Sequence, residues 1–194
     1  APFIEKLRER QAESTAALML EWIALSACRT GEARFATWAE IDLDRMIWAI
    51  PAARMKMRRD HVVPITKRMA EVLDQAKCRL GRPAKPSDWL FPGPRKGKPL
   101  SEMAGIQQMK RMDYGQFTVH GLRATFKGWA ATCTEFPREL IEEQLAHQLG
   151  AVERAYMRVH AVERRRAMME AWADQLSGLE AATGAANVVP MRTG

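Results

Sequence analysis

The 194-residue sequence lacks the features that mark membrane and secreted proteins. No apolar run approaches the roughly 18–20 residues of a membrane-spanning helix, and the most apolar stretch, Ala16–Cys28, is interrupted by Glu21. The charged start argues against a signal peptide. Cysteine is scarce, and Cys28, Cys78 and Cys133 are too far apart for a CxxC pair. We therefore expect reduced thiols, buried in the core of a cytoplasmic protein.

Motifs of metal enzymes and nucleotide hydrolases are also missing. The four histidines, His61, His120, His147 and His160, form no HExxH motif and have no paired cysteines nearby. Glu143 and His147 are four residues apart, which favours a surface ion pair on a helix over a metal site. Phosphate-binding GxxxxGK[ST] and GxGxxG loops and the GxSxG elbow are absent. The sequence predicts neither a metal nor a cofactor.

Positive charge is what the sequence has in excess. Lysine and arginine total 30 against 23 acidic residues, for a net charge of +7. This excess indicates a polyanionic partner such as nucleic acid. Charge alone leaves open a soluble basic protein with no such partner. Hydrophobic residues make up 47% of the chain, enough for a globular core.

Hydrophobic periodicity predicts one mainly helical α+β domain with a small antiparallel sheet. Helical spacing runs through the first 38 residues, with Ser14 as an N-cap and a third short helix that carries Phe35 and Trp38. Two runs rich in Ile, Val and Trp predict strands. The strands are expected at Met46–Ile50 and His61–Ile65, further helices at Lys67–Arg79 and Ala161–Leu176, a loop at Gly81–Pro99, and helix from Leu100 with breaks near 114–118, 135–137 and 150.

The domain is expected to span residues 1–176, followed by a flexible Gly/Ala/Thr tail over 177–194. Because the chain begins with Ala1 rather than Met, we expect an excised part of a longer protein.

A scattered set of basic groups and one tyrosine remains as candidate chemistry. The set, in chain order, is Arg29 with Glu32, Lys56 in a turn, His120 with Arg123, His147, and Tyr156 nine residues later. Taken singly, each has an ordinary explanation: a helix-capping ion pair, a solvated turn, a chance spacing or a half-buried tyrosine. Their order along the chain is the informative feature.

This order resembles the catalytic domain of the tyrosine recombinases, the phage integrase family, over roughly residues 12–176. Local strings match as well, and they are most like those of integrases from satellite phages and genomic islands. The strings are Arg29–Glu32 with Trp38–Asp42, Ile50–Arg59 closed by Val62–Ile65, Val119–Thr125, Gln144–His147 with Ala155–Arg158, and Glu163–Ala173.

The resemblance implies an integrase of a prophage or genomic island that needs no metal or nucleotide. Tyr156 would attack a DNA phosphate and form a 3′-phosphotyrosine. Arg29, Arg123 and His147 would stabilise the transition state, since guanidinium groups match phosphate oxygens. Further roles implied are Lys56 as general acid, His120 as acceptor or orienter of the Tyr156 proton, and Glu32 as the structural support of Arg29.

The partner implied is double-stranded DNA at attachment sites, bound by a homotetramer, with a monomer expected in the absence of DNA. An N-terminal DNA-binding domain, usual in such enzymes, would lie outside these 194 residues. The DNA backbone would be held by Arg54, Arg58, Arg59, Lys96 and Lys98, with Arg79, Arg82, Lys85 and Arg95 as further basic groups. Two alternatives stay open: a type-IB-like topoisomerase, which works as a monomer, and a non-catalytic basic DNA-binding module.

Overall fold

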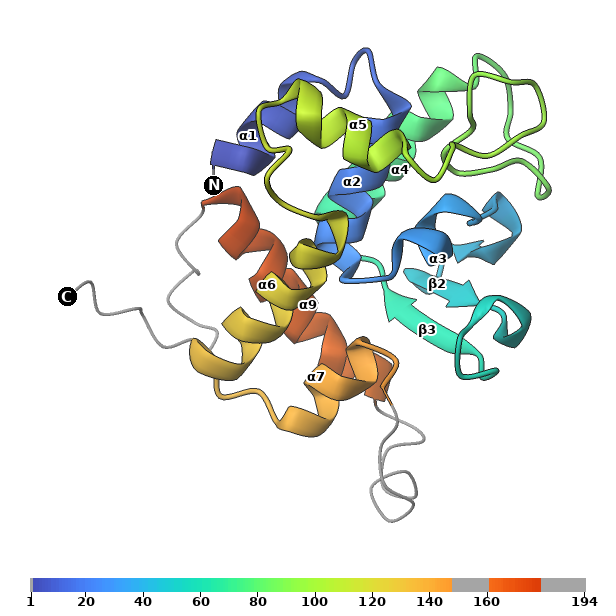
Figure 1. The fold of residues 1–194 in the computed structure, drawn as a ribbon. Coiled ribbons are helices and arrows are strands. Elements are labelled where there is room, and N and C mark those ends of the chain that lie inside the picture. Colours follow the sequence, from blue (N-terminus) through green and yellow to red (C-terminus); the bar gives the residue numbers. More distant parts are fainter. Residues whose placement is uncertain (1, 148–160, 179–194) are drawn as a thin grey trace.

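The computed structural model describes residues 2–147 and 161–178, and these form a mainly helical fold with a small antiparallel sheet, as predicted. The elements are α1 (Pro2–Glu9), α2 (Thr15–Ser26), α3 (Thr30–Arg34), a 3₁₀ turn η1 (Trp38–Glu40), β1 (Ile41–Asp42), β2 (Ile47–Ile50), a 3₁₀ turn η2 (Ala52–Arg54), β3 (His61–Pro64), α4 (Lys67–Arg79), α5 (Ala104–Arg111), α6 (Val119–Thr132), α7 (Arg138–Gln144) and α9 (Ala161–Ser177). In Figure 1, helices α1, α2, α4 and α5 lie in the upper part, the sheet lies at the right, and α6, α7 and α9 lie at the lower left.

Helix α2 is the central element of the fold. Nearly all of its residues are buried, and it packs against α1, α4, α5, α6 and α9. Its start is the predicted one, because the Ser14 side chain accepts a hydrogen bond from the Ala17 backbone N–H (3.2 Å). Its Trp22 ring meets the Trp48 ring of β2 edge-on, with 5.3 Å between centroids. The sheet is thereby fixed to the central helix.

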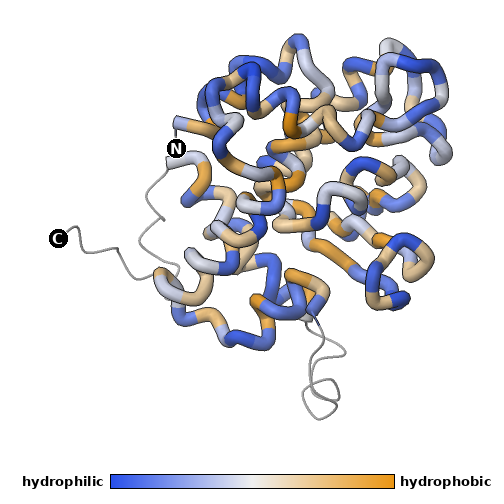
Figure 2. The backbone as a smooth tube through the Cα atoms, in the orientation of Figure 1, coloured by the Kyte–Doolittle hydropathy of each residue, from blue (hydrophilic) through white to orange (hydrophobic). Residues whose placement is uncertain are grey.

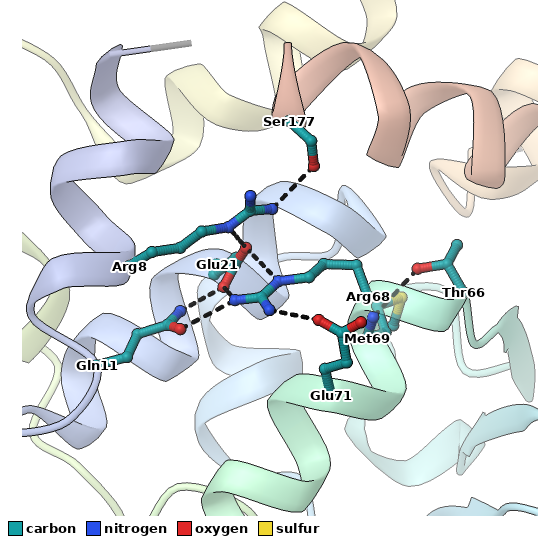
Figure 3. A network of polar contacts seen from close by, with 8 residues as sticks. All are labelled: Arg8, Gln11, Glu21, Thr66, Arg68, Met69, Glu71 and Ser177. Carbon is teal, nitrogen blue, oxygen red and sulfur yellow. Dashed lines mark hydrogen bonds and ion pairs between the residues drawn. The ribbon is translucent and has the colours of Figure 1, made fainter. Parts of the chain in front are cut away.

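One charged residue, Glu21, lies fully buried within α2 and is neutralised by arginines from other helices (Figure 3). Arg8 donates to its carboxylate at 2.7 Å, Arg68 donates at 2.8 and 2.9 Å, and Gln11 donates as well. Burial raises the pKa of Glu21, but the hydrogen bonds from Arg68, Gln11 and Arg8 outweigh this effect and leave the pKa below its ordinary value. Arg8 also donates to Ser177 at the end of α9 (2.9 Å). The network therefore joins four helices.

The sheet has the order β1–β2–β3, and both pairings are antiparallel. Ile47 pairs with Pro64 and Ile50 pairs with His61, so β2 and β3 form the predicted hairpin. Strand β1, which pairs with β2, is only two residues long and was not expected.

A second hydrophobic cluster lies between α6, α7 and α9. The Trp172 ring of α9 lies 5.6 Å from the Phe126 ring and 5.0 Å from the Trp129 ring, both on α6. Its indole N–H also donates to the Ala24 carbonyl of α2 (2.7 Å). Hydrophobic and hydrophilic positions alternate along these helices (Figure 2), as expected for helices with one buried face. Helix α9 thus connects both halves of the core.

Three local expectations need correction. The third helix ends at Arg34, so it does not reach Phe35 and Trp38, and Trp38 belongs to a separate 3₁₀ turn. Cys78 is exposed on α4, whereas Cys28 and Cys133 are buried as expected. Helix α9 extends through Ser177, one residue into the expected tail. The tail from 179 onward and the break expected near Gly150 lie outside the described residues. No described helix has the length and apolarity needed to cross a membrane.

Candidate active site

Arg29 lies where the chain leaves the central helix. Ala27 ends α2 in the left-handed region (φ 52°), and the chain turns so that Arg29 caps the start of α3. The Glu32 carboxylate accepts from the Arg29 guanidinium (2.8 Å) and from the Arg29 backbone N–H (2.7 Å). Glu32 is itself buried. The predicted ion pair is therefore present, and it fixes both the side chain and the backbone of Arg29.

Arg123 brings three segments together. It lies one turn into α6, which Thr118 caps, and only 5% of its surface is exposed. Its Nη1 donates to the Ala27 carbonyl at the end of α2 (2.6 Å). Its Nη2 donates to the Leu145 carbonyl after α7 and lies 3.2 Å from Nε2 of His147. Residues about 100 positions apart thus meet around one guanidinium.

His147 follows α7 on a sharp turn of the backbone. The helix ends at Gln144, and Ala146 adopts a left-handed conformation (φ 48°). This turn directs the ring back, and its Nδ1 meets the carboxylate of Glu142. The expected ion pair between Glu143 and His147 is wrong, because the helix ends before His147 and the spacing of four residues no longer places the two on one face.

The cluster of Arg29, Arg123 and His147, here called the cationic cluster, is electrostatically suited to an anion. Burial, followed by the positive charge of Arg29, lowers the pKa of Arg123. The neighbouring Cys28 is inert, because burial and the charge of Glu32 raise the pKa of its thiol to about 12. The carboxylates nearby, Glu32 and Glu142, pair with Arg29 and His147 and not with Arg123. The guanidinium groups of Arg29 and Arg123 therefore favour a bound anion with several acceptor oxygens.

The structure does not bring Lys56 or His120 into this cluster. Lys56 is exposed in the turn of the β2–β3 hairpin, and His120 is exposed one turn before Arg123 on α6. Within residues 2–147 and 161–178, neither forms a hydrogen bond or ion pair with Arg29, Arg123 or His147. Tyr156 lies outside the described residues.

Arg54, which the sequence predicts as a DNA contact, has partners within the fold. Its guanidinium donates to the Glu32 carbonyl (2.8 Å) and pairs with the carboxylate of Glu40, so it holds the hairpin against α3 and η1. Arg79 likewise donates to backbone carbonyls, among them that of Ala12 (2.7 Å). Arg82 pairs with Asp88. Backbone and carboxylate oxygens of the fold thus already accept from each of these arginines.

The other four residues expected to hold the DNA backbone are exposed at two tips. Arg58 and Arg59 lie in the hairpin turn, and Lys96 and Lys98 lie in the loop before α5. That loop has a defined shape, because Gly93 N–H donates to the Lys98 carbonyl (2.9 Å) and the Trp89 indole donates to the Gly97 carbonyl (3.1 Å). Both lysines are therefore presented on an ordered turn.

Two buried polar residues beneath the cluster were not predicted. Gln144 donates to the Ser26 carbonyl (2.8 Å) and accepts from Arg165 of α9 (3.1 Å). Arg165 also donates to the Val62 carbonyl of β3 (2.8 Å). In the sequence, Arg165 has the helical spacing to Met168, Met169 and Trp172 that places all four on one face of the helix. This spacing is the sequence feature that could have indicated its burial.

His61 at the start of β3 is a third buried group that the sequence did not single out. Burial and the positive charge of Arg165, with smaller contributions from Arg123 and Arg29, lower the pKa of His61 to about 3. The ring is therefore neutral beside three cations. No group of three or more His, Cys, Asp or Glu side chains that could hold a metal ion occurs in the described part of the chain.

Comparisons with known proteins bear on this arrangement. The model of the phage integrase family matches residues 3–163. The chain belongs to the phage integrase family. It is 33% identical over 184 residues to the prophage integrase IntZ of Escherichia coli K12, a match covering 94% of this chain and 45% of that protein. It is 30% identical over 192 residues to the integrase of enterobacteria phage P4, covering 90% and 43%. The predicted resemblance is confirmed.

The fold of this integrase-family chain is similar to that of a solved structure. The crystal structure of XerA recombinase matches with a TM-score of 0.55 and 18% identity, covering 84% of this chain and 59% of that one. The chain spans less than half the length of the curated relatives it matches. The family model and the curated relatives favour the integrase interpretation over a type-IB-like topoisomerase.

Proposed function

We propose that this chain is the catalytic domain of a site-specific DNA recombinase, the integrase of a prophage or genomic island. The observation that supports the proposal is the cationic cluster, in which α6, the α2–α3 junction and the end of α7 supply two guanidinium groups and an imidazole. These are the donors that a phosphodiester needs when no metal neutralises its developing charge.

In the proposed reaction, the Tyr156 hydroxyl oxygen attacks the scissile phosphorus and the bond from phosphorus to the 5′-oxygen breaks. The phenol loses its proton, for which His120 is the proposed acceptor or orienter. The 5′-oxygen leaves with a proton, for which Lys56 is the proposed donor. A 5′-hydroxyl of the second strand then attacks the 3′-phosphotyrosine and releases Tyr156. The covalent linkage conserves the energy of the original bond.

Arg29 and Arg123 would hold the equatorial oxygens of the phosphorane, and His147 would donate a further hydrogen bond. Glu32 would keep Arg29 in place through the two hydrogen bonds described above. Loss of one such preorganised donor typically costs about 3–4 kcal/mol of transition-state stabilisation.

Double-stranded DNA at attachment sites is the proposed partner, gripped at its backbone by Arg58, Arg59, Lys96 and Lys98. The protein is proposed to assemble as a homotetramer on DNA and to be a monomer without DNA. It would act in the bacterial cytoplasm, where such DNA resides. Arg54 is left out of this set because its charge is paired with the Glu40 carboxylate within the fold.

A nicked suicide duplex that contains the junction between the mobile element and the chromosome tests the proposal. Cleavage beside the nick releases a short fragment, so the covalent protein–DNA adduct cannot reverse and is seen in a denaturing gel. We expect this adduct with the natural chain and none with Tyr156→Phe, while both shift the duplex in a native gel. A shift without any adduct would support the non-catalytic DNA-binding module instead.

A further inference from the structure

The partners of His147 determine which of its ring nitrogens carries a proton. Nε2 lies 3.2 Å from Nη2 of Arg123, and a guanidinium can only donate. Nε2 must therefore be the acceptor, and the proton of the neutral ring must sit on Nδ1. Nδ1 lies within hydrogen-bond distance of the Glu142 carboxylate, and an ionised carboxylate can only accept a hydrogen bond. In the DNA-free protein, the ring is thus neutral with an Nδ1–H.

Glu142 is itself held in place from the opposite side. Its other carboxylate oxygen pairs with Lys127 of α6 at 2.8 Å, and only 13% of its side chain is exposed. Burial raises the pKa of Glu142, but the hydrogen bonds from Lys127 and His147 outweigh burial and leave it below its ordinary value. The carboxylate is therefore ionised. The His147 backbone N–H also donates to the Glu142 carbonyl (2.9 Å), which sets the ring and the carboxylate on one turn.

A phosphate in the cationic cluster would change this arrangement. An oxygen that takes the place of His147 as acceptor for Arg123 would face the lone pair of Nε2, and two acceptors repel one another. The repulsion is removed if Nε2 gains a proton. The resulting imidazolium would donate to phosphate through Nε2 and to Glu142 through Nδ1.

We propose that Glu142 is a positioning residue that fixes the Nδ1–H form of His147 and stabilises the imidazolium formed when phosphate displaces His147 from Arg123. The proton comes from solvent and binds Nε2. The hydrogen bond from Arg123 to Nε2 breaks, and each group donates to a phosphate oxygen instead. The phosphate step rests on the proposed function, whereas the Nδ1–H form is a property of the DNA-free protein.

The charged and titratable groups around this pair come from every element of the site. Helix α6 supplies Arg123 and Lys127, and the α2–α3 junction supplies Arg29 and Glu32. Behind the cluster lie His61 of β3 and Arg165 of α9. Glu142 is the one carboxylate among these groups that contacts the ring of His147.

Nitrogen-15 NMR of the histidine rings tests the first half of the proposal without DNA. The chain is labelled at histidine, and His147→Asn identifies the His147 signals by their loss. We expect the Nδ1–H tautomer in the natural chain. Glu142→Leu leaves Nδ1–H without its acceptor, so the ring should turn away from Arg123. It should then adopt the Nε2–H tautomer that an unconstrained histidine side chain prefers. Lys127→Met is the matched control, because it removes the other partner of Glu142 but keeps the carboxylate, and it should retain Nδ1–H.

The suicide duplex tests the second half. Glu142→Leu should slow single-turnover cleavage by at least about 10-fold, part of the roughly 10²–10³ that one preorganised donor contributes. Glu142→Gln keeps an acceptor without the charge, so it should retain the Nδ1–H form. Because the amide stabilises the imidazolium less than the carboxylate does, cleavage by this variant should be lost at a lower pH than in the natural chain as the pH is raised. An Nε2–H tautomer in the natural chain, or an unchanged tautomer in Glu142→Leu, would overturn the proposal even if the chain cleaves DNA. The expected tautomers without any cleavage would instead count against the recombinase function.

Discussion

The three histidines within the described residues differ in burial and in partners, and these differences decide what each can do. His120 is exposed on α6, His147 is held between Arg123 and Glu142, and His61 is 9% exposed beneath the cluster. Motif spacing identified His120 and His147. Nothing in the spacing marked His61, because burial and the approach of Arg165 depend on the tertiary fold.

The pH dependence of stability should report the burial of His61. Its pKa is lowered to about 3 in the folded protein, whereas an unfolded histidine titrates near 6.5. Between these values, the unfolded chain binds a proton that the folded chain does not, so stability falls as the pH falls. The slope from this one group approaches about 1.4 kcal/mol per pH unit. Urea denaturation at pH 7, 6, 5 and 4 measures it.

Carboxylates also titrate in this range, so the informative quantity is a difference between variants. His61→Gln should remove the histidine contribution and flatten the pH dependence. His120→Gln, which changes an exposed ring, should leave the natural dependence intact. If the stability of His61→Gln and that of the natural chain changed with pH in parallel, the lowered pKa of His61 would be contradicted.

At the scale of elements, the site depends on contacts that tie distant segments together. Gln144 connects α7 to the end of α2, and Arg165 connects α9 to both α7 and β3. Four elements that carry or adjoin proposed catalytic residues therefore share one buried polar network. Arg165 is also near Glu143, at 3.7 Å between its Nε and the carboxylate.

Replacing Arg165 should destabilise the fold. Arg165→Met keeps much of the side-chain volume but leaves the Val62 carbonyl and the Gln144 side-chain oxygen without their donor. Each unsatisfied buried acceptor costs about 1–3 kcal/mol, so we expect a loss of about 2–4 kcal/mol. Chemical denaturation of Arg165→Met, compared with Arg164→Met at the exposed neighbouring position, measures this loss. Equal stabilities of the two variants would show that the network contributes nothing.

Local patterns predicted the elements well, and tertiary contacts explain where they did not. Ser14, the two strands of the hairpin and α4 follow from capping, β-branched runs and helical spacing, and all are found as expected. The pairing of His147 was misassigned to Glu143, because the end of α7 is set by a left-handed residue, Ala146, that no pattern marks. Glu21 was visible as an interruption of an apolar run, but its arginine partners come from α1 and α4.

For the whole molecule, the net charge of +7 matters less than how the arginines and lysines are used. Sequence alone grouped Arg54 with Arg58 and Arg59, since all three lie in one polar turn. The fold separates them, because Arg54 points to Glu40 and Glu32 while the other two are exposed. Composition therefore predicted a polyanionic partner but not which cations are available to it.

The salt dependence of DNA affinity should distinguish these arginines. Each phosphate neutralised by a cation steepens the log–log dependence of affinity on salt by about 0.9. Arg58→Gln and Arg59→Gln should therefore each reduce the slope by about 0.9, measured by fluorescence anisotropy of a labelled duplex over a series of salt concentrations. Arg54→Gln is the matched control from the same hairpin: it should lower the stability of the fold and leave the slope unchanged. If Arg54→Gln reduced the slope as much as Arg58→Gln, Arg54 would have to leave Glu40 and contact DNA, and the division between structural and DNA-binding cations would be wrong.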